Sequence, residues 1–129
     1  MSNLSLAAIP LVSSPPGGKP YEITKIEYDC HMLTVDAESG ASRIKVVFDS
    51  PMGFRVLDEG DLLEFWPTCS ADNGWLYEIT QGGWLSLETT RDGFLLADRH
   101  DVREFFLAGE NECVSVLAVE RPVIKADEL

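Results

Sequence analysis

The sequence lacks several features that would narrow its function directly. It has only 3 cysteines in 129 residues, widely spaced and without a CxxC pair, so neither a disulfide scaffold nor a zinc site is indicated. No run approaches the ~18 apolar residues of a membrane helix. The N-terminal segment has no basic start of a signal peptide, and Pro10 interrupts its apolar stretch. We therefore expect a cytoplasmic protein without a metal or another cofactor.

Positively charged residues are also scarce. Lysine and arginine together number 10, against 22 aspartates and glutamates, and the formal net charge is -12. A field of this sign repels phosphate backbones and anionic lipid surfaces, so we expect no direct contact with nucleic acid or membranes. The same field attracts a basic protein, although acidity also serves solubility alone.

Motifs of common enzymes are missing as well. There is no GxSxG nucleophile elbow, and the two histidines, His31 and His100, lie in no catalytic pattern. A calcium loop starting at Asp58 fails because Gly60 and Leu62 stand where oxygen ligands are needed. The sequence therefore indicates a protein that is not an enzyme.

The sequence does contain a succession of short β-rich segments. In RIKVVF, residues 43–48, apolar side chains at Ile44, Val46 and Phe48 alternate with basic ones, which is the pattern of a half-buried strand. Similar segments recur at about ten-residue spacing. This spacing predicts a mainly β fold, an antiparallel sandwich or barrel-like sheet of about six to eight short strands, with room for one short helix.

Turn residues divide the chain into predicted hairpins. Gly82-Gly83 separates WLYEIT from WLSLET, and glycines supply the positive φ of tight turns, so we predict a hairpin there. Two more are predicted, one joining VREFFLA to CVSVLAV through GENE and one joining YEITKIEY to HMLTVDA. Residues 1–20 end in SSPPGGKP and are expected to form an N-terminal arm, because prolines and glycines fit neither a helix nor a central strand. Residues 21–129 then form a single β-rich domain.

The segment FRVLDEGDLLEFW, residues 54–66, places four carboxylates between apolar side chains. Its first part predicts a strand up to Leu57. The rest fits either a hairpin turning at DEGD or a helix that Asp58 caps and Pro67 ends. A carboxylate pair in a small β-barrel enzyme or ligand-binding protein is an alternative, but catalytic pairs usually come from different elements around a cleft. We therefore interpret these carboxylates as exposed surface residues and not as a catalytic pair.

Acidic residues and tryptophans concentrate in residues 51–88. This part has seven acids and one base, so it carries half of the net charge, and it contains all three tryptophans. Aromatic anchors within an acidic rim are typical of a surface that binds a basic protein. Core packing is the alternative for each tryptophan. The predicted partner-binding residues are Asp58, Glu59, Asp61, Glu64, Asp72, Trp75, Glu78 and Trp84.

Three stretches, FRVLDEGDLLEFW, NGWLYEITQGGWLSLE and REFFLAGENECVSVLAVERPVI, resemble small bacterial immunity proteins found beside polymorphic or contact-dependent growth inhibition toxins. The resemblance spans about residues 43–124. It implies a cytoplasmic, non-enzymatic protein that binds one cognate toxin domain, often a nuclease, and blocks its active site or substrate entry. Immunity surfaces diverge with their toxins, so the resemblance assigns no binding residue. The protein is expected to be a monomer or a homodimer, and a structural homodimer without a toxin is a further alternative.

Overall fold

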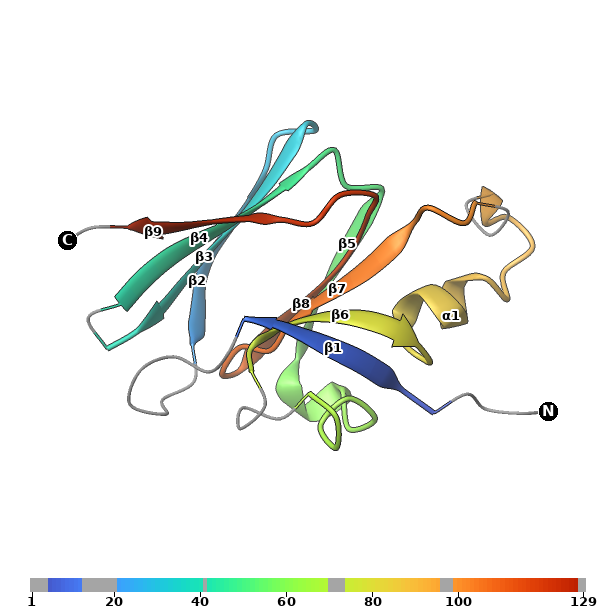
Figure 1. Ribbon diagram of the computed structural model, residues 1–129, viewed down its shortest axis with the longest axis horizontal. Helices are drawn as coiled ribbons and strands as arrows, with labels where there is room; N and C mark the ends of the chain where they lie inside the picture. The colour runs from blue at the N-terminus through green and yellow to red at the C-terminus, as the bar shows by residue number, and fades with distance from the viewer. Residues whose placement is uncertain (1–4, 13–20, 41, 70–73, 96–98, 128–129) are drawn as a thin grey trace.

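The computed structural model describes residues 5–12, 21–40, 42–69, 74–95 and 99–127. In these residues the chain forms two antiparallel sheets, one of five strands in the order β1-β6-β7-β8-β5 and one of four in the order β2-β3-β4-β9 (Figure 1). The predicted mainly β antiparallel fold is confirmed, and the two sheets are separate rather than closed into one barrel. The elements are β1 (Ala7–Val12), β2 (Glu22–Tyr28), β3 (Met32–Ser39), β4 (Ser42–Asp49), β5 (Gly53–Asp58), the 3-10 helix η2 (Glu59–Asp61), β6 (Leu76–Gln81), α1 (Trp84–Glu88), β7 (Arg103–Leu107), β8 (Glu112–Ala118) and β9 (Val123–Asp127).

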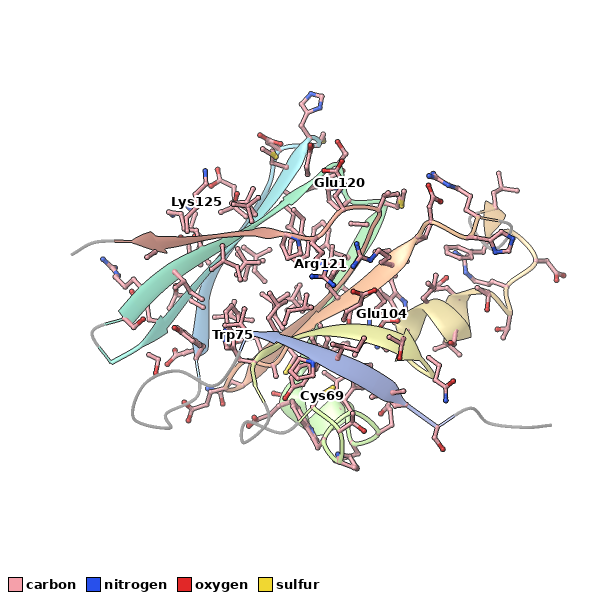
Figure 2. The ribbon with its side chains drawn as sticks, in the orientation of Figure 1. Cys69, Trp75, Glu104, Glu120, Arg121 and Lys125 are labelled. Atoms are coloured by element: carbon pink, nitrogen blue, oxygen red, sulfur yellow. The ribbon has the colours of Figure 1, made fainter. Side chains whose placement is uncertain are left out.

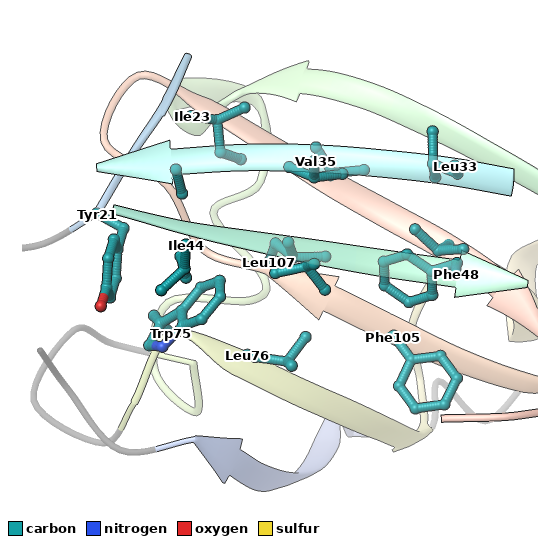
Figure 3. Close-up of a cluster of buried hydrophobic side chains, with 14 of the residues drawn as sticks. Tyr21, Ile23, Leu33, Val35, Ile44, Phe48, Trp75, Leu76, Phe105 and Leu107 are labelled. Atoms are coloured by element: carbon teal, nitrogen blue, oxygen red, sulfur yellow. The ribbon is translucent and has the colours of Figure 1, made fainter. Parts of the chain in front are cut away.

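The larger hydrophobic core lies between the two sheets (Figure 3). The alternation predicted for residues 43–48 is confirmed, because Ile44, Val46 and Phe48 of β4 are buried there. The ring centroids of Phe48 and Phe105 lie 5.8 Å apart across the core. Period-2 alternation on β3 and β4 thus supplies the side of this core that belongs to the four-stranded sheet.

The other face of the five-stranded sheet is covered by the segment that follows β5. Leu62 and Phe65 of that segment are almost fully buried against the sheet. The ring of Phe65 stacks on Phe106 of β7, with centroids 4.5 Å apart. Because this sheet is covered on both faces, β7 and β8 are apolar on both sides, which explains the unbroken runs FFLA and VLA.

Two of the three predicted hairpins are confirmed. β2 pairs with β3, and β7 pairs with β8, both antiparallel. The prediction of a hairpin at Gly82-Gly83 is wrong, because α1 follows β6 where a second strand was expected. Gly82 does adopt the positive φ that the prediction required, at 76°. The chain then turns into a helix because Glu104 binds its first N–H groups, as described below.

The N-terminal segment and residues 58–66 both differ from simple expectation. β1 lies within the expected arm and joins the five-stranded sheet at its edge, where Pro10 is tolerated because an edge strand needs fewer N–H donors.

Residues 59–61 form neither a hairpin nor an α-helix but the 3-10 turn η2, and the Asp58 carboxylate accepts the Gly60 N–H at 2.8 Å. None of the helices in the described ranges is long and apolar enough to cross a membrane.

Candidate interaction surface

Two chain segments bring exposed carboxylates to one end of the five-stranded sheet. Asp58 at the end of β5 is the strand partner of Glu112 at the start of β8. The N–H of Glu59 donates to the carbonyl of Asn111 at 2.8 Å, which ties η2 to the turn between β7 and β8. We call this the acidic surface, and its residues are Asp58, Glu59, Asp61, Glu64, Glu110 and Glu112, all exposed.

Packing beneath the acidic surface fixes its position. Leu62 and Phe65 anchor the segment to the sheet, and the indole N–H of Trp66 donates to the Glu59 carbonyl at 2.8 Å. Leu63 points away from these anchors and is 73% exposed. The acidic surface therefore combines fixed backbone, exposed carboxylates and one exposed apolar side chain.

The carboxylates of the acidic surface have no close ion-pair partners, although Arg55 interacts with Glu64 at longer range. Within the described part of the chain, none of its six carboxylates forms an ion pair with a lysine or arginine. Acids elsewhere do have such partners, for example Asp36 with Lys45 at 3.1 Å and Glu38 with Arg43 at 2.6 Å. Carboxylates without a close ion-pair partner thus gather at one end of the five-stranded sheet.

The predicted partner-binding residues divide into three groups. Asp58, Glu59, Asp61 and Glu64 are brought together on the acidic surface. Asp72 lies outside the described residues. Trp75, Glu78 and Trp84 lie elsewhere and take part in the packing of the fold.

Trp75 is a core residue and not an exposed anchor. Its side chain is only 3% exposed, and its ring centroid lies 4.7 Å from that of Tyr21 between the sheets. A partner cannot reach this ring while the fold is intact. We therefore remove Trp75 from the binding surface, in agreement with the burial preference of large aromatic side chains.

Glu78 is held in an ion pair within the fold. Both guanidinium nitrogens Nη2 and Nε of Arg103 donate to its carboxylate, at 2.6 and 3.0 Å. Hydrogen bonding to Arg103 is the main reason that the pKa of Glu78 lies below its ordinary value, against a smaller opposing effect of burial. Glu78 is therefore a structural residue, and it does not add free charge to the acidic surface.

Replacing Glu78 with glutamine is expected to lower the free energy of unfolding at pH 7 by about 1 kcal/mol, because a bidentate charged pair becomes a neutral contact. A group whose pKa is lowered by folding contributes stability above its unfolded pKa and loses it as pH falls through the folded pKa. The difference between the two proteins in urea unfolding should therefore shrink below about pH 4.5. Glu27→Gln is the control, since its pair with Lys25 is 62% exposed and should matter by less than ~0.5 kcal/mol. A difference that does not shrink as pH falls below about 4.5 would contradict this account.

Trp84 belongs to an arrangement around a buried carboxylate that the sequence did not reveal. Glu104 of β7 is 1% exposed and accepts the backbone N–H of Trp84 at 3.0 Å and of Leu85 at 2.7 Å (Figure 2). The guanidinium of Arg55 lies 5.2 Å from the centroid of the Trp84 ring. Burial raises the pKa of Glu104, and the two N–H groups and Arg55 oppose this rise. Trp84 thus attaches α1 to the sheet and is only half-buried.

The sequence offered a weak signal for Glu104. In REFFLA the glutamate is followed by four apolar residues. Such a run indicates a strand that is buried on both faces, and a glutamate within that strand must then also be buried. Glu110 and Glu112 were visible in the predicted GENE turn, but only the register between β5 and β8 brings the end of this turn, at Glu112, beside Asp58.

Two of the three cysteines are buried, whereas Cys30 is exposed. Cys69 and Cys113 are buried, and burial raises the pKa of these thiols to about 12 and about 11, so both stay protonated near neutral pH. In the ranges that the structure describes, no three histidine, cysteine, aspartate or glutamate residues are gathered as metal ligands.

Comparison with known proteins adds no assignment. The chain has no significant match to a protein-family model, to a curated protein or to a solved structure. The resemblance to immunity proteins therefore rests on the three stretches quoted above.

Proposed function

We propose that this chain is an immunity protein that binds a cognate bacterial toxin domain with a basic surface and blocks its active site or substrate entry. The observation that carries the proposal is the acidic surface, whose six exposed carboxylates lack ion-pair partners among the described residues. Like charges held close together repel each other and oppose the compact state. A basic partner relieves this repulsion, whereas a neutral partner does not.

A nuclease is the toxin class that such a surface fits best. A nuclease presents lysine and arginine side chains to the phosphate backbone of its substrate. The acidic surface offers carboxylates to the same side chains, so the two ligands compete for one site. Leu63, exposed between Asp61 and Glu64, supplies the apolar contact that charges alone do not provide. The association rate then depends on charge, and the lifetime of the complex depends on the buried contact.

The gene immediately upstream provides the first test. We expect it to encode a large secreted protein with a basic C-terminal domain, and co-expression of this chain should restore the growth of cells that produce that domain. The purified pair should form a stable complex in size-exclusion chromatography. A metabolic gene in that place, or a C-terminal domain that neither inhibits growth nor binds, would reject the proposal.

Charge reversal tests the acidic surface itself. Asp61→Lys with Glu64→Lys should slow association with the toxin domain by a factor of about 10 or more at low salt, because electrostatic steering is reversed locally. The effect should diminish at high ionic strength. Asp92→Lys with Glu120→Lys is the matched control, because both positions are exposed, lie outside the acidic surface and change the net charge equally. Stopped-flow or biolayer measurements give the rates, and equal rates for the two variants would exclude the acidic surface.

A further inference from the structure

The four strands at the sheet edges differ in how well they are protected. The edges are β1 and β5 in one sheet and β2 and β9 in the other. Natural proteins guard such edges with proline, charged side chains or bulges. β1 has Pro10 and two shifts of register, β2 has one shift and the charged Lys25 and Glu27, and β9 has Lys125. Three of the four edge strands therefore have a feature that is known to hinder pairing with a strand of another chain.

β5 is the least protected of the four edges, because its one exposed charge, Asp58, lies at its last residue. Its sequence GFRVLD has neither proline nor lysine, and its register with β8 is unbroken from Gly53 to Asp58. Its single basic residue, Arg55, lies over the Trp84 ring on the sheet face that α1 covers. In the described part of the chain, no strand lies beyond β5. The edge of β5 is regular and open to pairing.

The hydrogen-bond pattern shows which backbone groups of β5 are available. The N–H of Glu59 donates to Asn111, and in an antiparallel pair every second residue bonds to the neighbouring strand. Leu57, Arg55 and Gly53 therefore bond to β8, in register with Cys113, Ser115 and Leu117. Phe54 and Val56 direct their N–H and C=O groups away from β8, toward the open edge.

The surroundings of this edge are apolar at one end and acidic at the other. Val56 is 41% exposed, and nearby Tyr28 and Met32, at the tip of the β2–β3 hairpin, are 44% and 42% exposed. The Tyr28 and Phe54 rings meet edge to face with centroids 5.2 Å apart, so the hairpin tip extends the apolar surface of β5. The strand ends at Asp58, where the acidic surface begins.

We propose that the toxin domain adds a β-strand to β5, with apolar side chains along Phe54 and Val56 and lysine or arginine side chains at the Asp58 end. This inference rests on the proposed immunity function and specifies how the partner binds. Main-chain hydrogen bonds supply affinity in this mode, and the alternating side chains supply selectivity. A second copy of this chain is a poor occupant, because each copy carries a net charge of -12 and would bring a second acidic surface.

Residue-resolved amide exchange tests the added strand directly. The probe is the C-terminal domain encoded upstream, in a form without toxic activity. In the free protein, the N–H groups of Phe54 and Val56 should exchange rapidly, and in the complex they should be protected by about tenfold or more, as one new hydrogen bond per amide implies. A complex in which both amides exchange at the free rate would overturn strand addition and leave the immunity function intact. Absence of any complex would overturn both proposals, and protection that rises with concentration in the free protein would assign the edge to a second copy instead.

Substitutions at Val56 provide an independent readout. Val56→Pro removes an outward N–H that makes no strand bond in the free protein, and it should weaken binding by about tenfold. Val56→Lys keeps the backbone N–H group but places a charged side chain on the edge strand, which hinders pairing. It should therefore also weaken binding by about tenfold. Val123→Lys on the β9 edge is the matched control, since Val123 is 57% exposed and receives the same substitution. Equal affinities of V56K and V123K, with both proteins folded, would overturn the proposed strand addition.

Discussion

Replacing Glu104 with alanine is expected to destabilise the protein by about 3 kcal/mol, since two partly buried backbone donors lose their acceptor and a nearby guanidinium loses an opposite charge. The donors are the N–H groups of Trp84 and Leu85, and the guanidinium is that of Arg55. Equilibrium unfolding in urea measures the loss, and hydrogen exchange of the α1 amides should rise more than that of the strands. Glu104→Gln is the matched control, because it keeps the shape and one carbonyl acceptor and should lose about half as much. Equal loss in the two variants would mean that volume, and not hydrogen bonding, is what Glu104 contributes.

The pH dependence of Glu104 has the opposite sign to that of Glu78. Burial is the largest cause of its raised pKa, so folding favours the protonated form relative to the unfolded chain. A group with a raised folded pKa contributes stability that is fully present below its unfolded pKa and is lost as pH rises through the folded pKa. The advantage of the wild type over Glu104→Gln should therefore decrease as pH rises above about 4.5 and then level off. An advantage that grows over this range would contradict the burial of an unbalanced carboxylate.

Replacing Phe65 with alanine should have the largest effect on stability, a loss of about 4 kcal/mol, which is typical of a fully buried phenylalanine. The ring is 0% exposed and stacks on Phe106, where it holds the segment that carries the acidic surface. Thermal and urea unfolding measure the loss. Leu63→Ala is the control two residues away, and because Leu63 is 73% exposed, its removal should change stability by less than ~0.5 kcal/mol.

The same two variants separate the fold from the interface. Phe65→Ala should weaken toxin binding through displacement of Asp61 and Glu64, whereas Leu63→Ala should weaken binding with the fold intact. A Leu63→Ala protein that binds like the wild type would remove Leu63 from the proposed contact. A stable Phe65→Ala protein would show that the segment is not held by this ring.

The parts of the fold that the sequence predicts correctly are those decided locally. Residues 43–48 alternate with period 2, and the two confirmed hairpins have polar turns between apolar strands. α1 was missed because a single side chain, Glu104, decides the conformation at residues 84–85 from twenty residues away. β1 was missed because prolines near it argue against a central strand, whereas it lies at an edge. Local patterns do not contain this information.

The candidate site was predicted only in part for the same reason. The charges at Asp58, Glu59, Asp61 and Glu64 are contiguous in sequence, so their clustering on one surface needed no tertiary knowledge. Strand register adds Glu112, Glu110 follows from the adjacent turn, and burial removes Trp75. Glu78 is a structural residue and not a free surface charge, because it pairs with Arg103 on the neighbouring strand.

The attachment of α1 also sets an order of events in folding. A helix of five residues has too few internal hydrogen bonds to persist in water by itself. Its anchor, Glu104, is in place only when β7 has paired with β6, since Ile79 and Glu104 are strand partners. We therefore expect α1 to form after this pairing and to open before the sheets separate. α1 is therefore folded only as long as the strands beneath it are assembled.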